Sequence, residues 1–316
     1  MGERFFNKKM ILKIGTRGSK LALTQSRWVK EKVEEKHPDV RVELVRIKTT
    51  GDKILDSPLS KIGGKGLFVK EIEEALINKS IDMAVHSMKD VPAELPEVLT
   101  LSVFPERENP RDAIVSLGNL TIDQLSRGAK VGTSSLRRAA QLLHIRRDLA
   151  ILPLRGNVDT RLRKLESGEL HAIILATAGL KRLGFKDRIS QVISSEHILP
   201  AIGQGALGLE VRREDEQTIS LINFLNHTPT ELTVRAERAF LKKLQGGCQV
   251  PVAGFARLDG ETMHLAGMVA ELDGTRLLRD DMKGEMNQAE KIGNTLAERL
   301  LDAGADKILA RIYGAA

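Results

Sequence analysis

The amino-acid sequence predicts an α/β protein with two hinged α/β domains and a small C-terminal α+β domain that has a three-stranded antiparallel sheet. In two stretches, short apolar runs typical of strands alternate along the chain with segments whose apolar residues have helix spacing. Two segments that contain proline or glycine, residues 106–111 and 199–205, indicate that the chain crosses twice between these stretches. With 316 residues, the chain is also too long for one simple core.

The first α/β stretch carries its apolar residues at strand spacing and at helix spacing in turn. This alternation implies a parallel sheet with right-handed crossovers. The expected strands are residues 11–16, 40–47, 81–88 and 99–104, with helices at residues 20–36 and around Ile72 and Leu76.

The second α/β stretch repeats this arrangement. Ser134 or Ser135 is expected to cap its first helix, because serine side chains accept hydrogen bonds from the first turn of a helix. The expected strands are residues 130–133, 149–154 and 171–177, with helices at residues 134–147 and 158–169.

The C-terminal third begins with a helix at residues 230–244, followed by three alternating runs at residues 252–257, 263–269 and 276–282. Asp259-Gly260 and Asp273-Gly274 separate the runs, and Asp-Gly pairs favour hairpin turns. A last helix carries Ile292, Leu296 and Leu300. The predicted domains are residues 10–106 with 203–225, residues 107–202 and residues 226–316, after an N-terminal extension at residues 1–9.

The composition, 41% hydrophobic and 29% charged, is that of a folded globular protein. No apolar run approaches the roughly 20 residues that span a bilayer. Residues 1–10 lack the apolar core of a secretory signal, so we expect a cytoplasmic protein with no membrane partner. The single cysteine, Cys248, excludes an internal disulfide and a cysteine-based metal cluster, and we predict no metal site.

The net charge of +7 predicts an anionic partner. Residues 127–165 hold ten basic and two acidic residues, so their net charge of +8 exceeds that of the whole chain. Nucleic acid is a weak candidate, because aromatic residues make up only 3% of the chain and single-strand binders need aromatic stacking platforms. A small molecule with several carboxylates fits better. The arginines at predicted strand ends and helix starts, where such a ligand binds bidentately, are Arg17, Arg137, Arg138, Arg155, Arg161 and Arg182.

Asp90 follows the buried strand at residues 81–88, with Ser87 and Lys89 beside it. In open α/β sheets, ligands bind at the carboxyl ends of the strands. Two interpretations are open from these residues alone. Asp90 is either a catalytic carboxylate or the start of an Asx-turn into Pro92.

Cys248 follows Gly246 and Gly247 in a short loop after a helix. A buried structural thiol is the commonest role of a lone cysteine. The flanking glycines favour instead a side chain that projects from a flexible loop. No histidine lies in a motif that would make Cys248 a nucleophile of the usual kind.

Six segments together resemble the porphobilinogen deaminase (hydroxymethylbilane synthase) family. They occur in the family's order and span most of the chain, although the N-terminal extension and the acidic Asp159 depart from the pattern. The segments are Gly-Thr-Arg-Gly-Ser at 15–19, Gly-Gly-Lys-Gly at 63–66, His-Ser-Met-Lys-Asp-Val-Pro at 86–92, Gly-Thr-Ser-Ser-Leu-Arg-Arg at 132–138, Leu-Arg-Gly-Asn-Val at 154–158 and Gly-Gly-Cys-Gln-Val-Pro at 246–251.

The resemblance implies a transferase whose first two domains are like hinged periplasmic binding proteins. It implies a dipyrromethane cofactor joined by a thioether to Cys248, onto which four porphobilinogens are added with loss of ammonia, to give hydroxymethylbilane for haem and porphyrin biosynthesis. Asp90 is then the catalytic carboxylate, which stabilises the cation left when ammonia departs. The implied cofactor-binding residues are Cys248, Lys89, Arg137, Arg138, Arg155, Ser87, Thr133, Ser134, Ser135 and Asp52. The implied substrate-binding residues are Arg17, Ser19, Arg155, Arg161, Arg182, Gln204, Lys65 and Phe68.

A non-catalytic anion-binding module is the main rival interpretation, and a nucleic-acid binder is the third. The module would use the same arginines but would give Asp90 and Cys248 no purpose. We also expect a monomer, and a lid formed by residues 63–66, whose glycines tolerate unusual backbone angles.

Overall fold

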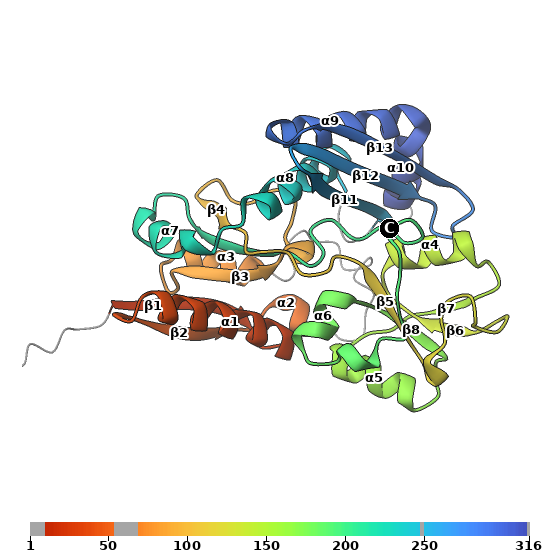
Figure 1. The fold of residues 1–316 in the computed structure, drawn as a ribbon, viewed down its shortest axis with the longest axis horizontal. Coiled ribbons are helices and arrows are strands. Elements are labelled where there is room, and N and C mark those ends of the chain that lie inside the picture. The colour runs from red at the N-terminus through yellow and green to blue at the C-terminus, as the bar shows by residue number, and fades with distance from the viewer. Residues whose placement is uncertain (1–9, 54–68, 247–249, 315–316) are drawn as a thin grey trace, which may run out of the picture.

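The computed structural model describes residues 10–53, 69–246 and 250–314 and contains three sheets, two of five strands and one of three (Figure 1). The predicted fold class is confirmed by these sheets. We define three units by them: an N-terminal unit, a middle unit and a C-terminal unit. The predicted domain boundaries stay a prediction. None of the described helices is long and apolar enough to cross a membrane.

The sheet of the N-terminal unit has the strand order β2-β1-β3-β10-β4. β1 lies parallel to β2 and β3, as predicted, whereas β10 runs antiparallel to β3 and β4. The sheet is therefore mixed, which corrects the expectation of a parallel one. Its strands are β1 (Met10–Arg17), β2 (Val40–Ile47), β3 (Met83–Ser87), β4 (Leu99–Val103) and β10 (Leu207–Arg212).

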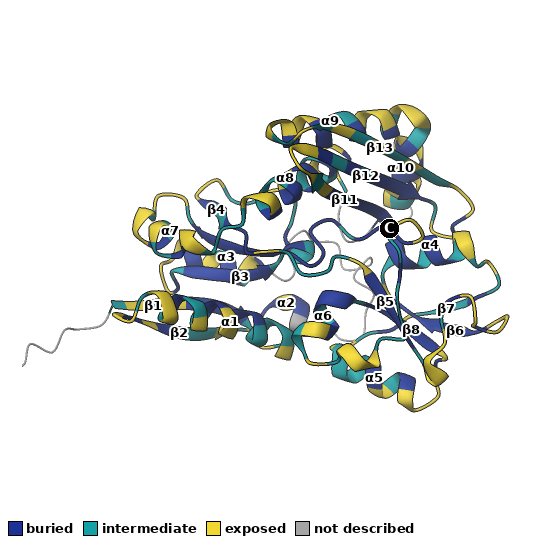
Figure 2. Ribbon diagram, viewed as in Figure 1, coloured by how far each residue is buried: buried dark blue, intermediate teal, exposed yellow. Residues whose placement is uncertain are grey.

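Helices cover both faces of this sheet. α1 (Lys20–Lys36) buries Val29 and Val33 against β3, while α3 (Lys70–Ile77) buries Ile72 and Leu76 on the opposite face. β3 is consequently buried along nearly its whole length, as its dark blue colour in Figure 2 shows. The other helices of the unit are α2 (Thr50–Lys53) and α7 (Glu216–Ile222).

The sheet of the middle unit repeats this topology, in the order β7-β6-β8-β5-β9. β6 is parallel to β7 and β8, and β5 is antiparallel to β8 and β9. In each unit, one antiparallel strand comes directly after a crossing: β5 after the first crossing (residues 106–111) and β10 after the second (residues 199–205). The elements are β5 (Asp112–Ser116), β6 (Lys130–Gly132), α4 (Leu136–Ile145), β7 (Ala150–Leu152), α5 (Val158–Glu166), β8 (Ala172–Ala176), α6 (Thr177–Arg182) and β9 (Gln191–Val192).

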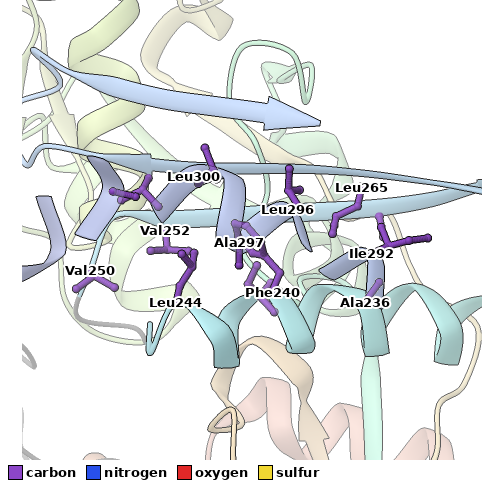
Figure 3. Packing of buried hydrophobic residues seen from close by; sticks show 14 of the residues in the cluster. Ala236, Phe240, Leu244, Val250, Val252, Leu265, Ile292, Leu296, Ala297 and Leu300 are labelled. Carbon is purple, nitrogen blue, oxygen red and sulfur yellow. The ribbon is translucent and has the colours of Figure 1, made fainter. Parts of the chain in front are cut away.

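The C-terminal unit packs two helices against an antiparallel sheet of order β11-β12-β13, as predicted. Phe240 of α8 lies in its core, in one buried cluster with Leu296 and Ala297 of α9 and Leu265 of β12 (Figure 3). A terminal helix, α10, follows a kink at Gly304 and was not predicted. The elements are α8 (Thr228–Lys243), β11 (Val252–Asp259), β12 (Thr262–Ala270), β13 (Leu277–Glu285), α9 (Ala289–Leu300) and α10 (Asp306–Gly314).

The C-terminal unit also packs on α4 of the middle unit. Ala140 of α4 joins Met268 and Ala270 of β12 in one buried apolar cluster. The loop between β12 and β13 reaches α4, as Figure 1 shows, and the Gly274 carbonyl lies 2.9 Å from the His144 imidazole Nδ1. Gly274 has a φ of +71°, and a Cβ there would lie 2.4 Å from the Ala140 carbonyl oxygen. The contact between the units therefore requires glycine at this position.

We expect Gly274→Ala to destabilise the protein more than Gly260→Ala. Both glycines have positive φ, so each alanine costs roughly 1–2 kcal/mol of backbone strain. Only Gly274 also has α4 backbone in the way, and overpacking adds about 1–3 kcal/mol. Urea unfolding of both variants measures the difference. Equal losses would show that the loop yields without disturbing α4.

Candidate active site

Asp90 ends a short 3-10 turn, Met88–Asp90, directly after β3. Because β1 and β3 are parallel neighbours, their carboxyl ends meet at one edge of the sheet. Arg17, the last residue of β1, brings its Nη1 to 4.0 Å from Asp90 Oδ2. The Asp90 side chain is 39% exposed, so it is a solvent-facing carboxylate beside a cation.

The strand that carries Asp90 is held on both sides. The Gln25 amide of α1 and the Ser87 hydroxyl exchange hydrogen bonds of 2.9 and 3.2 Å. On the other side the second crossing passes so close that a Cβ on Gly203 would lie 2.7 Å from Met88 Cβ. The end of β3 is therefore fixed before any ligand binds.

Lys89 is partly buried between Asp90 and the arginines of α4. The pKa of its ammonium is lowered from 10.5 to about 8, chiefly by burial and also by the charges of Arg138 and Arg137, while Asp90 and Asp112 oppose the shift. Lys89 therefore changes charge just above neutral pH.

Arg137 and Arg138, both predicted to bind the cofactor, are buried in the structure. They share a fully buried carboxylate, that of Asp112 at the start of β5. Arg137 Nη1 lies 2.7 Å from Asp112 Oδ2, and Arg138 Nη2 lies 2.7 Å from Oδ1. Burial alone would raise the pKa of Asp112, but the two guanidinium groups hold it well below its usual range.

Gln204, expected to bind substrate, belongs to the same buried cluster. Its amide Nε2 donates to the Pro110 carbonyl at 2.6 Å and to Asp112 Oδ1 at 3.0 Å. Its backbone carbonyl accepts from Arg107 Nε at 2.9 Å. Gln204 thus joins the two crossings to each other.

Arg161 and Arg182 are also desolvated. The pKa of each guanidinium is lowered to about 10, chiefly by burial. Arg138 and Arg155 contribute to the shift of Arg161 and Asp90 opposes it, whereas Glu108 opposes that of Arg182. Arg161 Nε donates to the Gly156 carbonyl at 2.8 Å, and Arg182 Nη2 donates to that of Gly205 at 2.7 Å. Arg155 is half-buried just after β7.

The predicted hydroxyl donors stabilise local structure. Ser19 caps α1 by accepting from Ala22 N at 3.2 Å, and Ser135 caps α4 by accepting from Arg138 N at 3.4 Å. Ser134 donates to the Leu154 carbonyl at 3.0 Å, so its proton is already engaged. Thr133 is buried, and its hydroxyl accepts a hydrogen bond from Ser135 N.

Several predicted residues lie outside the described part of the structure. These are Lys65, Phe68 and Cys248, together with residues 63–66 and 1–9; Asp52 lies in α2, but its side chain is not described.

Asp112, Gln25 and Arg107 were not predicted from the sequence. Asp112 lies in a stretch interpreted as a crossing, and Gln25 lies on the expected buried side of a helix. The apolar run after Asp112 was the available signal for a strand with an acid at its start.

A second contact joins the N-terminal and middle units across their facing helix starts. Lys20 Nζ of α1 lies 3.3 Å from Asp159 Oδ1 of α5 and 5.3 Å from the centre of the Phe185 ring. Asp159, the acid that departs from the family pattern, thus pairs with a lysine beside the capping residue Ser19. Both side chains are well exposed, so the pair contributes little to stability.

Around Asp90, cations outnumber acids. Lys89, Arg138 and Arg161 interact electrostatically with one another or with Asp90, and Asp112 is the second acid of the group. Such a cluster suits a ligand that carries several carboxylates. The donor set therefore fits a polycarboxylate pyrrole cofactor.

Among solved structures, periplasmic binding proteins show weak similarity to this chain. The aliphatic sulphonate binding protein of Escherichia coli is 16% identical, with a TM-score of 0.41, and the match covers 74% of this chain and 70% of that one. A probable amino-acid transporter binding protein of Bacillus subtilis is 12% identical, with a TM-score of 0.40, and the match covers 69% of this chain and 90% of that one.

Sequence relatives are far closer. The family model described as porphobilinogen deaminase, dipyromethane cofactor binding domain, matches residues 12–220, and that of the porphobilinogen deaminase C-terminal domain matches residues 231–302. Porphobilinogen deaminase of Geobacter metallireducens is 55% identical over 302 residues, 96% of this chain and 95% of the relative. Porphobilinogen deaminase of Syntrophotalea carbinolica is 56% identical over 301 residues, which are 95% of this chain and 96% of the relative. The chain therefore belongs to the porphobilinogen deaminase family.

Proposed function

We propose that Asp90 is the catalytic carboxylate of this chain, in the reaction that joins four porphobilinogen molecules head to tail into hydroxymethylbilane and releases ammonia. The observation that carries this proposal is a solvent-facing carboxylate at the carboxyl end of β3, 4.0 Å from the Arg17 guanidinium and surrounded by further cations. Each porphobilinogen carries an acetate and a propionate arm, which these cations would bind.

Asp90 would act at the aminomethyl arm of the substrate. The carbon–nitrogen bond breaks, the amine leaves as ammonia with a proton from an acid, and a pyrrole cation is left behind. A fixed carboxylate beside the pyrrole N–H stabilises this cation more than the neutral substrate, which lowers the barrier. The same carboxylate can take the proton that the coupled pyrrole loses.

The dipyrromethane cofactor supplies, when bound, the pyrrole end onto which the first substrate is joined. We propose that Cys248 anchors it. This cysteine belongs to the segment between α8 and β11, and its one-time bond needs no base at each turnover. Arg137, Arg155 and Lys89 would hold the carboxylates of the bound pyrroles.

We also propose that the chain acts as a cytoplasmic monomer whose partner is a small molecule rather than nucleic acid or a membrane. The partly buried positions of Arg155, Arg161 and Arg182 support this, because cations that read a nucleic-acid backbone lie on an open surface. Light scattering after size-exclusion chromatography should give the mass of one chain, and the mass of two would contradict the proposal.

A non-catalytic anion-binding module is the second candidate, because the same cations would serve it. Intact mass spectrometry of the denatured protein separates the two. We expect an excess mass of two linked pyrrole units that is lost in Cys248→Ser. A bare chain that stays bare after incubation with porphobilinogen would favour the binding module.

Asp90→Asn should lower the turnover of porphobilinogen by about 10²–10⁴-fold, the usual contribution of an acid–base group. The side chain is well exposed, so the free energy of unfolding should change by no more than about 0.5 kcal/mol. A stopped-flow or discontinuous assay of product, with a urea titration as control, measures both. More than a few per cent residual activity would exclude this role.

The apparent affinity for porphobilinogen should fall as pH rises through about 8, where Lys89 loses its charge. Lys89→Arg keeps a cation there and should move the fall in affinity to higher pH.

The Lys89 contribution to the free energy of unfolding should change in the opposite direction over the same pH range. The pKa of Lys89 is about 8 in the folded chain and 10.5 ordinarily, so the unfolded chain binds more protons between pH 8 and 10.5. The contribution of Lys89 to the free energy of unfolding therefore rises as pH increases through this range.

Measuring kcat/KM from pH 6 to 10 for both proteins tests this assignment. An alkaline limb that is identical in Lys89→Arg would belong to another group.

A further inference from the structure

The segment that carries Asp90 is held on each side by a polar contact that the proposed reaction does not use. Before Asp90, the His86 imidazole Nε2 lies 2.8 Å from Glu210 Oε2, and these side chains are only 5% and 1% exposed. After Asp90, the Ala93 carbonyl accepts a hydrogen bond from Arg238 Nη2 at 3.1 Å. The two contacts come from β10 and α8, which are distant from Asp90 in sequence.

The strand pairing explains why His86 and Glu210 meet. In the antiparallel register of β3 and β10, Gly208 lies opposite His86, so Glu210 is its diagonal neighbour. Side chains two residues apart share a face of a strand, and Ala84 packs in the buried apolar cluster of α3. The acid and the imidazole therefore lie on a covered, largely apolar face, where water does not balance their charges.

Glu210 has an acceptor left, and Arg238 has a donor left. Glu210 Oε1 and Arg238 Nη1 are both buried, and neither has a hydrogen-bond partner among the described residues. The pKa of the Arg238 guanidinium is lowered to about 10, chiefly by burial, while the charge of Glu210 opposes the shift. The two groups thus attract each other between β10 of the N-terminal unit and α8 of the C-terminal unit.

Glu73 of α3 is the other acid that interacts with this group. Its pKa is raised from 4.5 to about 7, chiefly by burial and also by the charge of Glu210, while His86 opposes the shift. Near neutral pH Glu73 is therefore only partly ionised, whereas the attraction on Arg238 comes from Glu210.

The chain between the two contacts is short and tightly packed. Met88 N donates to the Ala206 carbonyl at 3.1 Å, and Val91 N donates to the Met88 carbonyl at 3.2 Å. Met88 and Val91 lie in one buried apolar cluster with Val234 of α8. Holding both flanks of this turn therefore fixes where the Asp90 carboxylate lies.

We propose that Glu210 is a positioning residue for Asp90. It holds the chain before Asp90 through its contact with His86. It holds the chain after Asp90 through Arg238, because its charge keeps that guanidinium beside the Ala93 carbonyl. A carboxylate fixed in this way needs no reorganisation when a cation forms beside it. This inference rests on the proposed function, because it takes Asp90 as the catalytic carboxylate.

The main test is Glu210→Gln, which keeps the size of the side chain and an oxygen for His86 but removes the charge that attracts Arg238. We expect kcat to fall about tenfold, as for a misplaced catalytic group, and KM to change by less than about twofold. Rates are expressed per chain that carries the two pyrrole units, counted by intact mass spectrometry. A wild-type kcat would overturn the inference.

Hydrogen exchange of residues 86–93, measured by mass spectrometry, tests the anchoring without reference to activity. We expect the amides of Met88 and Val91 to exchange about tenfold faster in Glu210→Gln, because local opening of the turn becomes easier. Normal exchange would count against the role of Glu210. Full activity of Asp90→Asn, assayed in parallel, would count against the proposed function instead.

The matched control is Asp82→Asn, at the opposite end of β3 from Asp90. Asp82 Oδ1 lies 3.5 Å from Arg212 Nη2 of β10, and Oδ2 accepts from Lys13 N at 2.8 Å. This variant also removes an acid that joins β3 to its neighbours, so we expect a wild-type kcat and normal exchange of residues 86–93. Equal losses in both variants would reduce Glu210 to a general contribution to stability and would contradict the positioning role.

A second variant keeps the test open if Glu210→Gln does not fold. Arg238→Met keeps the apolar stem of the side chain but removes the guanidinium, and it leaves the contact between His86 and Glu210 in place. We expect a similar fall in kcat, and the double variant should lose no more than the more impaired single variant, because both changes break one anchor. A wild-type kcat in Arg238→Met would overturn the proposal.

Discussion

The rest of the site depends on the buried ion cluster of Asp112, Arg137 and Arg138. Removing charges from water is costly, and breaking such a pair by removing one partner costs about 3–5 kcal/mol, because the other charge stays buried. The cluster is therefore an all-or-none arrangement. It stands where the first crossing enters the middle sheet and α4 begins, so the positions of a strand, a helix and a crossing are set by one carboxylate.

The cluster continues into the C-terminal unit. Gln204 contacts Asp112 with its side chain and Arg107 with its carbonyl. Arg107 forms a two-point pair with the fully buried Glu237 of α8, at 2.6 and 3.1 Å. Glu237 also accepts from the backbone N–H groups of Gly203 and Ala256, which belong to the second crossing and to β11. Hydrogen bonds thus connect the middle and C-terminal units through the two crossings, and α8, which precedes the segment of Cys248, is part of the same network.

Local patterns predicted much of the fold. The bounds expected for α1 and β2 agree with the structure because each has a clear apolar period between polar ends. β5 and β10 were missed because both are short, follow a crossing and pair with strands distant in sequence, which no local period reveals. The same holds within the site. Asp90 and the arginines occupy strand ends that the pattern marks, whereas Asp112 depends on partners from α4 and the second crossing, which only the folded chain brings together.

Desolvation also explains why this site is built mainly from arginine. Burial brings the pKa of Lys89 down to about 8, so a lysine in this environment is only partly charged at mildly alkaline pH. The same burial leaves the pKa of Arg161 and Arg182 at about 10, far enough above neutral for both to stay charged. Where burial lowers the pKa of a cation this far, a lysine stays charged near neutral pH only if an acid is close to it. Lys89 meets that condition, because Asp90 and Asp112 both raise its pKa.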